Sequence, residues 1–150
     1  MAGLYYEEFS VGQEFKHSLT RTITEMDNIM FCSMTHNPQP LHLDEEFSKG
    51  TMYGQRIVNS LFTLGLLIGV TVGETTLGTT LGNLGMTDVR FKNPVFHGDT
   101  MRVVTRIKEM RESKSRPDSG LVVFEHIRYN QRDEEIAYCV RTGLMMKKPA

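Results

Sequence analysis

The feature that most constrains the fold is the segment LFTLGLLIGV at residues 61–70, which is apolar on every side when wound into a helix. A helix without a polar face must be buried on all its faces. Asn59 or Ser60 can cap its N-terminus. Gly65 and Gly69 lie one turn apart, so another group can approach the backbone there. The run is shorter than the roughly 20 residues that a membrane span needs, so we expect a central buried helix and no membrane partner.

After this segment the hydrophobic period changes to two, which is typical of strands. Alternation predicts strands near residues 84–91, 101–108, 121–129 and 136–146, with a slip near Asp88 in the first. Residues 130–134 make a hairpin turn between the last two strands, and 113–120 form a longer exposed turn. A weaker strand is expected within residues 14–23. His17 and His126 fall in these strand patterns, and we expect both to be exposed.

Before the central helix, Thr24 and Asp27 have the spacing of a capping box. The predicted helix after it has one apolar face, should end at residues 36–37 before Pro38, and is followed by a short helix over residues 44–49. The apolar face comprises Met26, Ile29, Met30 and Met34.

The order of these elements indicates the fold class. A helix that is apolar all round must be enveloped, and a curved antiparallel sheet is the element available to do so. We therefore predict an α+β protein, one domain over residues 1–150, in which a curved antiparallel β-sheet wraps a buried central α-helix. This arrangement is the hot-dog fold.

Charge and cysteine content exclude several kinds of partner. Seventeen Lys and Arg oppose eighteen Asp and Glu, so nothing indicates nucleic-acid binding. Cys32 and Cys139 have neither disulfide-framework nor metal-ligand spacing, and no His, Cys and carboxylate cluster suggests a metal. We see no signal peptide, and we expect a cytoplasmic protein without a metal.

The segment THNPQPLHLD at residues 35–44 has two prolines and two histidines. Proline fixes φ and removes a donor, so we expect a stiff extended loop rather than a helix or strand. Such a loop is a good platform for His42, whose imidazole can take or give a proton near neutral pH.

This segment resembles the signature of the MaoC-like hydratases, which are hot-dog proteins. Pro40, Leu41, His42 and Asp44 match its Pro-Leu-His-x-Asp half, after an aromatic residue at Phe31. Gln39 stands where the family has Asn, His36 where it has Gly, and Asn37 where it has a catalytic Asp. In a second register, Asn37-Pro38 matches the family's Asn-Pro and Thr35 replaces the Asp. The resemblance covers nearly the whole chain, including Asn93-Pro94 and Gly98-Asp99-Thr100.

The resemblance implies reversible addition of water across the 2,3 double bond of an enoyl thioester, with coenzyme A as part of the substrate and no other cofactor. His42 would be the water-activating base, beside Asn37. The backbone N–H of Ser60, at the start of the central helix, would stabilise the thioester oxygen. Gln39, Asn59 and His36 would bind substrate or orient water. A branched or dicarboxylic acyl group would fit the changed polar pair.

The absent carboxylate leaves three readings open, because an amide has no proton to give at neutral pH. His42 could both take and return the proton while Asn37 and Gln39 hold the water. His36 or Asp27 could supply the acid. Alternatively the hydratase chemistry is lost, and the site binds or hydrolyses thioesters.

Structural roles compete with each of these assignments. The ring of His42 could simply bond a loop carbonyl. His36 could cap a helix C-terminus, and Asn37 could close that helix in the left-handed conformation. Asp27 could only complete its capping box, and Asp44 could cap the short helix.

Two other functions remain as alternatives. A hot-dog thioesterase usually carries a carboxylate on or beside the central helix, and residues 61–73 contain none. A non-catalytic acyl-thioester binding subunit is the natural result of losing the Asp. In either case the family pairs protomers edge to edge, so we expect a homodimer or a dimer of dimers.

Overall fold

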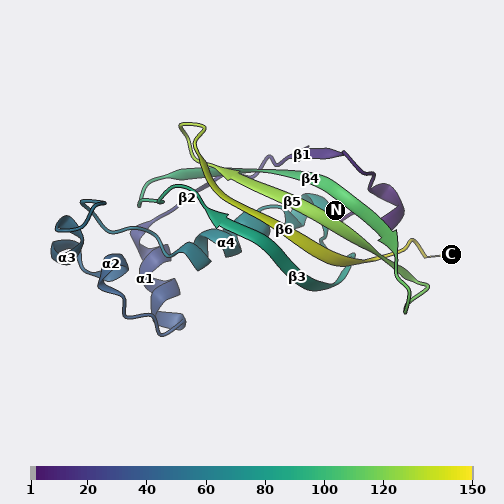
Figure 1. The fold of residues 1–150 in the computed structure, drawn as a ribbon, viewed down its shortest axis with the longest axis horizontal. Helices are drawn as coiled ribbons and strands as arrows, with labels where there is room; N and C mark the ends of the chain where they lie inside the picture. Colours follow the sequence, from purple (N-terminus) through teal and green to yellow (C-terminus); the bar gives the residue numbers. More distant parts are fainter. Residues whose placement is uncertain (1–2, 150) are drawn as a thin grey trace.

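The computed structural model describes residues 3–149, in which an antiparallel sheet packs against one central helix (Figure 1). Its strand order is β1-β4-β5-β6-β3, and β2 pairs separately with β4. The predicted strands and the hairpin turn are present. The strands are β1 Glu14–Lys16, β2 Arg21–Thr22, β3 Thr80–Phe91, β4 Thr100–Glu112, β5 Ser119–Tyr129 and β6 Glu135–Met146.

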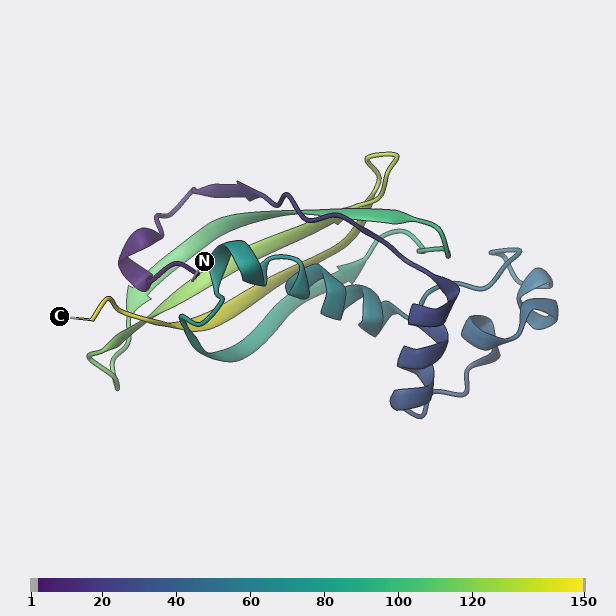
Figure 2. The same cartoon turned by 180° about the vertical axis from the view of Figure 1, so that it is seen from behind.

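The central helix α4 spans Ser60–Gly69 and runs along the inner face of the curved sheet (Figure 2). The predicted hot-dog arrangement is therefore confirmed. The remaining helical segments are a 3-10 turn at Tyr6–Glu8, α1 Glu25–Met34, α2 Pro40–Leu43, α3 Glu45–Lys49 and α5 Val72–Thr75. Helices α1, α2 and α3 lie beyond one end of the sheet, at the N-terminal end of α4 (Figures 1 and 2).

The main core lies between α4 and the sheet. Leu67 of α4 and Val70 after it are buried against strand residues, while Phe62, Leu64, Leu66 and Ile68 are partly buried against the same cluster. Burial of such side chains contributes about 1.5–3 kcal/mol each, so this contact fixes the position of α4. The strand and loop members of the cluster are Ile23, Val58, Val95, Met101, Val103, Ile136, Ala137 and Cys139.

Helix α4 is nevertheless not enveloped on all sides, which corrects the prediction. Leu61 is 59% exposed, and a Cβ placed on Gly65 or Gly69 would meet no atom of residues 3–149 within 4 Å apart from the adjacent backbone of its own helix. The sheet is open and packs against one side of the helix. The other side of α4 has no cover from residues 3–149 at Leu61, Gly65 and Gly69.

Helix α1 is also buried through a different face from the one expected. Its capping box is confirmed, because Thr24 and Asp27 exchange hydrogen bonds. Its buried residues are Asn28 and Cys32, whereas Met26 and Met34 are mostly exposed. The helix packs against irregular chain whose backbone groups need hydrogen bonds, so an amide rather than a methionine occupies the contact.

Two local predictions about the N-terminal half need correction. Residues 40–43 form one helical turn, α2, and not an extended loop, because proline fits the first position of a helix, where no N–H is needed. The single weak strand is divided into β1 and β2. The short helix α3 is as predicted, and the side chain of Asp44 caps it by accepting from the N–H of Phe47.

Strand β3 is a long edge strand at one side of the sheet. Its pairing with β6 is irregular between Thr87 and Arg90, where Asp88 has φ 55°, which confirms the predicted slip. The strand also exposes apolar side chains along its length. These are Leu81, Leu84, Met86, Val89 and Phe91.

The expectation that His17 and His126 are exposed is wrong, because both are buried on the inner face. Arg141 has only donors, so its Nε donates to Nε2 of His126, whose Nδ1 then donates to the Thr105 hydroxyl. That hydroxyl donates to Nε2 of His17, leaving Nδ1 to donate to Glu74 at 2.7 Å. Each histidine is thus held neutral with both ring nitrogens used.

Candidate active site

His42 lies on α2, at the end of the molecule where α4 begins. Its Nδ1 is 2.9 Å from the carbonyl oxygen of Ile57. A carbonyl can only accept, so Nδ1 carries the hydrogen in the neutral ring and Nε2 keeps its lone pair. No atom of residues 3–149 hydrogen-bonds Nε2. The structural role suggested for this ring is therefore present, and it orients the other nitrogen as a free base.

Asn28 of α1 connects the elements around this histidine. Its Nδ2 lies 3.2 Å from the carbonyl oxygen of His42 and 3.1 Å from that of Ile57. Its Oδ1 accepts from the N–H of Asn59 at 2.9 Å, and its side chain is fully buried. One amide thus ties α2 to the segment that enters α4. Sequence reasoning missed this residue because the methionines of α1 indicated a different buried face.

Arg56 provides a second tie around the same end. Its guanidinium contacts Glu25 of α1 at 2.6 Å and Glu45 of α3 at 2.8 Å. The hydrogen bonds from Glu45 and Glu25 raise the pKa of Arg56 above its ordinary value. The pair of contacts holds the overhanging helices together and so supports the position of α2 between them.

Ser60 is the first residue of α4, and its N–H has no acceptor within residues 3–149. The preceding Asn59 caps the helix by accepting from the N–H of Leu61 at 2.9 Å. The free Ser60 N–H sits at the positive end of the helix dipole, where negative charge is stabilised. The backbone at this position therefore has the property that an oxyanion donor needs.

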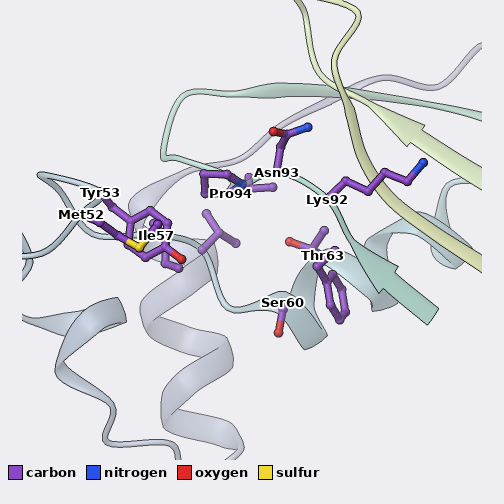
Figure 3. A pocket seen from close by; sticks show the side chains of 11 residues that line it. Met52, Tyr53, Ile57, Ser60, Thr63, Lys92, Asn93 and Pro94 are labelled. Carbon is purple, nitrogen blue, oxygen red and sulfur yellow. The ribbon is translucent and has the colours of Figure 1, made fainter.

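A cleft of about 390 Å³ opens beside this helix terminus. Ser60 and Thr63 of α4 lie on one side, and Lys92, Asn93 and Pro94 lie across from them (Figure 3). Ile57, Val58, Phe91 and Val95 also line the cleft. Figure 3 shows Met52 and Tyr53 at one end of the cleft and Lys92 at the other. Ser60 lines this cleft directly, and His42 is linked to it through Ile57, which lines the cleft and whose carbonyl oxygen binds the His42 ring.

Asn37 and His36 line a different, more open hollow of about 300 Å³, with Cys32, Pro38 and others. His36, not Asn37, takes the left-handed conformation that ends α1, with φ 54°. The Asn37 side chain accepts from the N–H of Gln39 at 3.0 Å, and Gln39 is exposed. The structure thus groups these three polar residues with each other rather than with Ser60.

Asn59 and Asp27 are committed to structural contacts. The Asn59 side chain is buried, with Nδ2 3.7 Å from Cys32 Sγ and Oδ1 on the helix cap. Burial raises the pKa of Asp27, but hydrogen bonds from Thr24 and the charge of Arg21 outweigh it and hold that pKa below its ordinary value. Asp27 is therefore ionised near neutral pH and is a poor source of the missing proton.

The family is decided by a model described as MaoC like domain, which matches residues 8–129. The chain belongs to the MaoC-like domain family. The resemblance inferred from residues 37–44 is therefore confirmed for most of the chain.

Curated relatives of this MaoC-like chain are named as hydro-lyases of coenzyme A esters. It is 27% identical to Beta-methylmalyl-CoA dehydratase of Chloroflexus aurantiacus over 97% of this chain and 41% of that protein. It is 32% identical to 3-hydroxybutyryl-CoA dehydratase of Methylorubrum extorquens, over 75% of this chain and 69% of that protein. The chain thus spans about two fifths of the Chloroflexus relative.

Among solved structures, the MaoC-like dehydratase from Rhodospirillum rubrum superimposes with a TM-score of 0.86 at 25% identity. The match covers 99% of this chain and 100% of the other. No helix within residues 3–149 is long and apolar enough to cross a membrane.

Proposed function

We propose that this protein is a hydratase or dehydratase of coenzyme A thioesters, adding water reversibly to the 2,3 double bond of an enoyl group. The observation that carries the proposal is that Ile57, whose carbonyl oxygen binds the His42 ring and leaves Nε2 free, lines the same cleft as Ser60, whose N–H is also free. Membership of a family whose curated relatives are named as such enzymes supports it.

In the proposed reaction, Nε2 of His42 takes a proton from water as its oxygen bonds to C3. The electron pair of the double bond moves toward the thioester, whose oxygen gains negative charge and is stabilised by the Ser60 N–H. The imidazolium then returns the proton to C2, so one water is added in all. No electrons are exchanged with a second molecule, so we expect no dissociable redox cofactor and take coenzyme A as part of the substrate.

Asn37 lines the other hollow together with His36, so we assign it no proton transfer. Its amide accepts from Gln39 N–H and keeps its own N–H groups as donors. With Asp27 ionised and His36 exposed in the other hollow, we assign both proton transfers to His42. The thioesterase alternative is disfavoured because α4 carries no carboxylate.

Loss of enoyl-thioester absorbance tests the proposal, with wild type and His42→Ala compared. We expect turnover by the wild type and a loss of at least about 100-fold in the variant, which is within the usual contribution of a general base. Lys16→Ala, whose side chain is 82% exposed and remote from the cleft, is the control. If neither protein turns over any enoyl thioester while both bind it, a binding subunit is the correct reading.

We also propose that the working unit is a homodimer, or a dimer of dimers, formed through β3. This edge strand carries five exposed large apolar residues, and Phe91 at its end lines the cleft. Unpaired edges of this kind are normally covered or charged. A second copy would cover the edge and complete the cleft.

Size-exclusion chromatography with light scattering tests the dimer. Leu84→Lys on β3 should shift the protein toward monomer, because a charge opposes edge pairing. Leu19→Lys is a matched control, since Leu19 is 57% and Leu84 56% exposed. A monomeric wild type would contradict the proposal.

For the compartment we propose the cytoplasm. Cys32 and Cys139 are both free and buried, which suits a reducing environment. Burial raises the pKa of Cys139 to about 11, so its thiol is inert there.

A further inference from the structure

Arg128 of β5 is a cation enclosed in the core. Its side chain is fully buried, and its Nη1 donates to the carbonyl oxygen of Thr63 at 2.5 Å. Its Nε and Nη2 have no partner, and no carboxylate within residues 3–149 lies at ion-pair distance from it. The guanidinium therefore has one neutral acceptor and unused donors on its other nitrogens.

An arrangement of this kind is costly in a protein that offers nothing else. An unpaired buried charge loses its hydration without a compensating partner, at a cost of several kcal/mol. Burial lowers the pKa of Arg128 to about 10, so the group stays charged at neutral pH. A water molecule can accept hydrogen bonds from the unused N–H groups, but it supplies no negative charge. An anion is what this site lacks.

Arg128 lies behind the wall of the cleft, because Thr63, whose carbonyl oxygen accepts from it, is a lining residue. Register across the sheet places Val103, Arg128, Ala137 and Phe91 in one row on the face that packs against α4. Phe91 lines the cleft, and only the methyl group of Ala137 stands between it and Arg128 in that row. Within this row of the sheet, no bulky side chain therefore separates Phe91 from Arg128.

Thr63 approaches the same point from the helix. It lines the cleft, and its buried Oγ1 has no hydrogen-bond partner, like the two nitrogens of Arg128 (Figure 3). A hydroxyl donor and a guanidinium are the groups that recognise a carboxylate. The three unused polar atoms therefore belong to two residues in direct contact, and one of them, Thr63, lines the cleft.

The position of Thr63 relative to Ser60 gives the length of the ligand. Three residues along an α-helix correspond to about 4.5 Å of axial rise. If the thioester oxygen lies at the Ser60 N–H, a group at Thr63 is a few bonds further along the acyl chain. A carboxylate at C4 of a four-carbon acyl group is at such a distance.

We propose that Arg128 and the Thr63 hydroxyl form a subsite for a free carboxylate at the far end of a short acyl group, so that the substrate is the coenzyme A thioester of a dicarboxylic acid. The subsite rests on the proposed function for the placement of the thioester. It makes Arg128 a residue that determines specificity and not one that takes part in proton transfer.

Calorimetric binding of two unreactive thioesters tests the subsite without requiring turnover. Succinyl-CoA carries a carboxylate at C4, and butyryl-CoA has the same chain length without it. We expect the wild type to bind succinyl-CoA at least about tenfold more tightly, which corresponds to about 1.4 kcal/mol. Equal affinities, or a preference for butyryl-CoA, would overturn the subsite.

Variants then assign the preference to the proposed residues. Arg128→Met keeps the length of the side chain without its charge and should remove the preference for succinyl-CoA while leaving butyryl-CoA affinity within about twofold. Thr63→Val keeps the shape and should reduce the preference in part, and it serves if Arg128→Met does not fold. Lys92→Met, which removes a cation elsewhere in the cleft, should keep the preference.

The outcomes separate this inference from the function on which it rests. If butyryl-CoA binds and straight-chain enoyl-CoA is hydrated but no carboxylate preference exists, only the subsite is wrong. If neither thioester binds, the proposed function is wrong as well. A preference that is retained by both Arg128→Met and Thr63→Val would place the carboxylate elsewhere and contradict the subsite.

Discussion

Ser60→Pro removes the backbone N–H at the start of α4, and comparison with Ser60→Ala, which loses only the hydroxyl, makes it a sharp test of the oxyanion assignment. Ser60 is the first residue of α4, a position that proline favours. The preceding Asn59 has ψ 128°, in the extended region that a residue before proline adopts. The lost N–H has no acceptor within residues 3–149, so no hydrogen bond of the fold is broken.

The structure therefore separates the effect on stability from the effect on rate. The free energy of unfolding should change by no more than about 1 kcal/mol, because the helix is compatible with proline and no native bond is lost. The turnover number should fall by about 10²–10³-fold, corresponding to about 2.7–4 kcal/mol, if this N–H is an oxyanion donor. Ser60→Ala keeps the N–H and should retain most of the activity.

Steady-state kinetics on an enoyl-CoA, with urea unfolding of the same preparations, measures both quantities. We expect Ser60→Pro to lower kcat far more than it raises KM, since the oxygen becomes negative only in the reaction. The reasoning is refuted if Ser60→Pro and Ser60→Ala have equal kcat values in folded protein. It is also refuted if the lost activity follows lost stability.

Three other predictions follow from hydrogen bonding and charge. Asn28→Ala should lower the free energy of unfolding by about 2–4 kcal/mol, because it leaves the buried Asn59 N–H and two carbonyls unpaired. Asn93→Ala removes one exposed hydrogen bond and should lower it by less than about 1 kcal/mol, and urea unfolding of the two variants tests the difference. Burial lowers the pKa of His17 and His126, so the unfolded chain binds protons first, and unfolding measured at several pH values should show stability falling below about pH 6.5. Asn37→Asp should raise hydratase turnover in the absorbance assay if a carboxylate can act from that position, and unchanged turnover would show that it cannot.

The sequence predicted the parts of the fold that depend on repeating patterns. Alternation in residues 101–146 predicted β4, β5 and β6, because a strand that packs on one face alternates apolar and polar residues. The segment 61–70, which has no polar face as a helix, predicted α4. The capping residues Thr24, Asp44 and Asn59 were recognisable for the same kind of reason, since a short oxygen-bearing side chain has a fixed task at a helix start.

The burial of side chains that pack against loops, or against residues distant in sequence, could not be predicted from periodicity. The inner position of His126 depends on Arg141 and Thr105, which are distant in sequence. Asn28 is buried because irregular backbone surrounds it, and nothing local distinguishes it from an exposed asparagine. The prediction that the methionine face of α1 is buried was wrong, because an apolar face in the sequence does not show which surface, if any, packs against it.

The candidate site was predicted in part. The family resemblance predicted His42 and the Ser60 N–H; Ser60 lines the cleft, and His42 is linked to it through Ile57, which lines the cleft and binds the His42 ring. The sequence motif could not indicate that Asn37 and His36 line a separate hollow, because the one-turn helix α2 reorients the chain between these residues and His42. Arg128 gave no signal at all, since a strand arginine is ordinarily exposed.

Hydration of an enoyl-CoA in D₂O, followed by mass spectrometry of the product, tests the central claim most directly. The account predicts a 3-hydroxyacyl thioester with one deuterium fixed at C2, delivered by His42 after it activates water, and no labelled product with His42→Ala. Three results would contradict the account: release of the free acid, no deuterated product with the wild type, or as much deuterated product with His42→Ala as with the wild type.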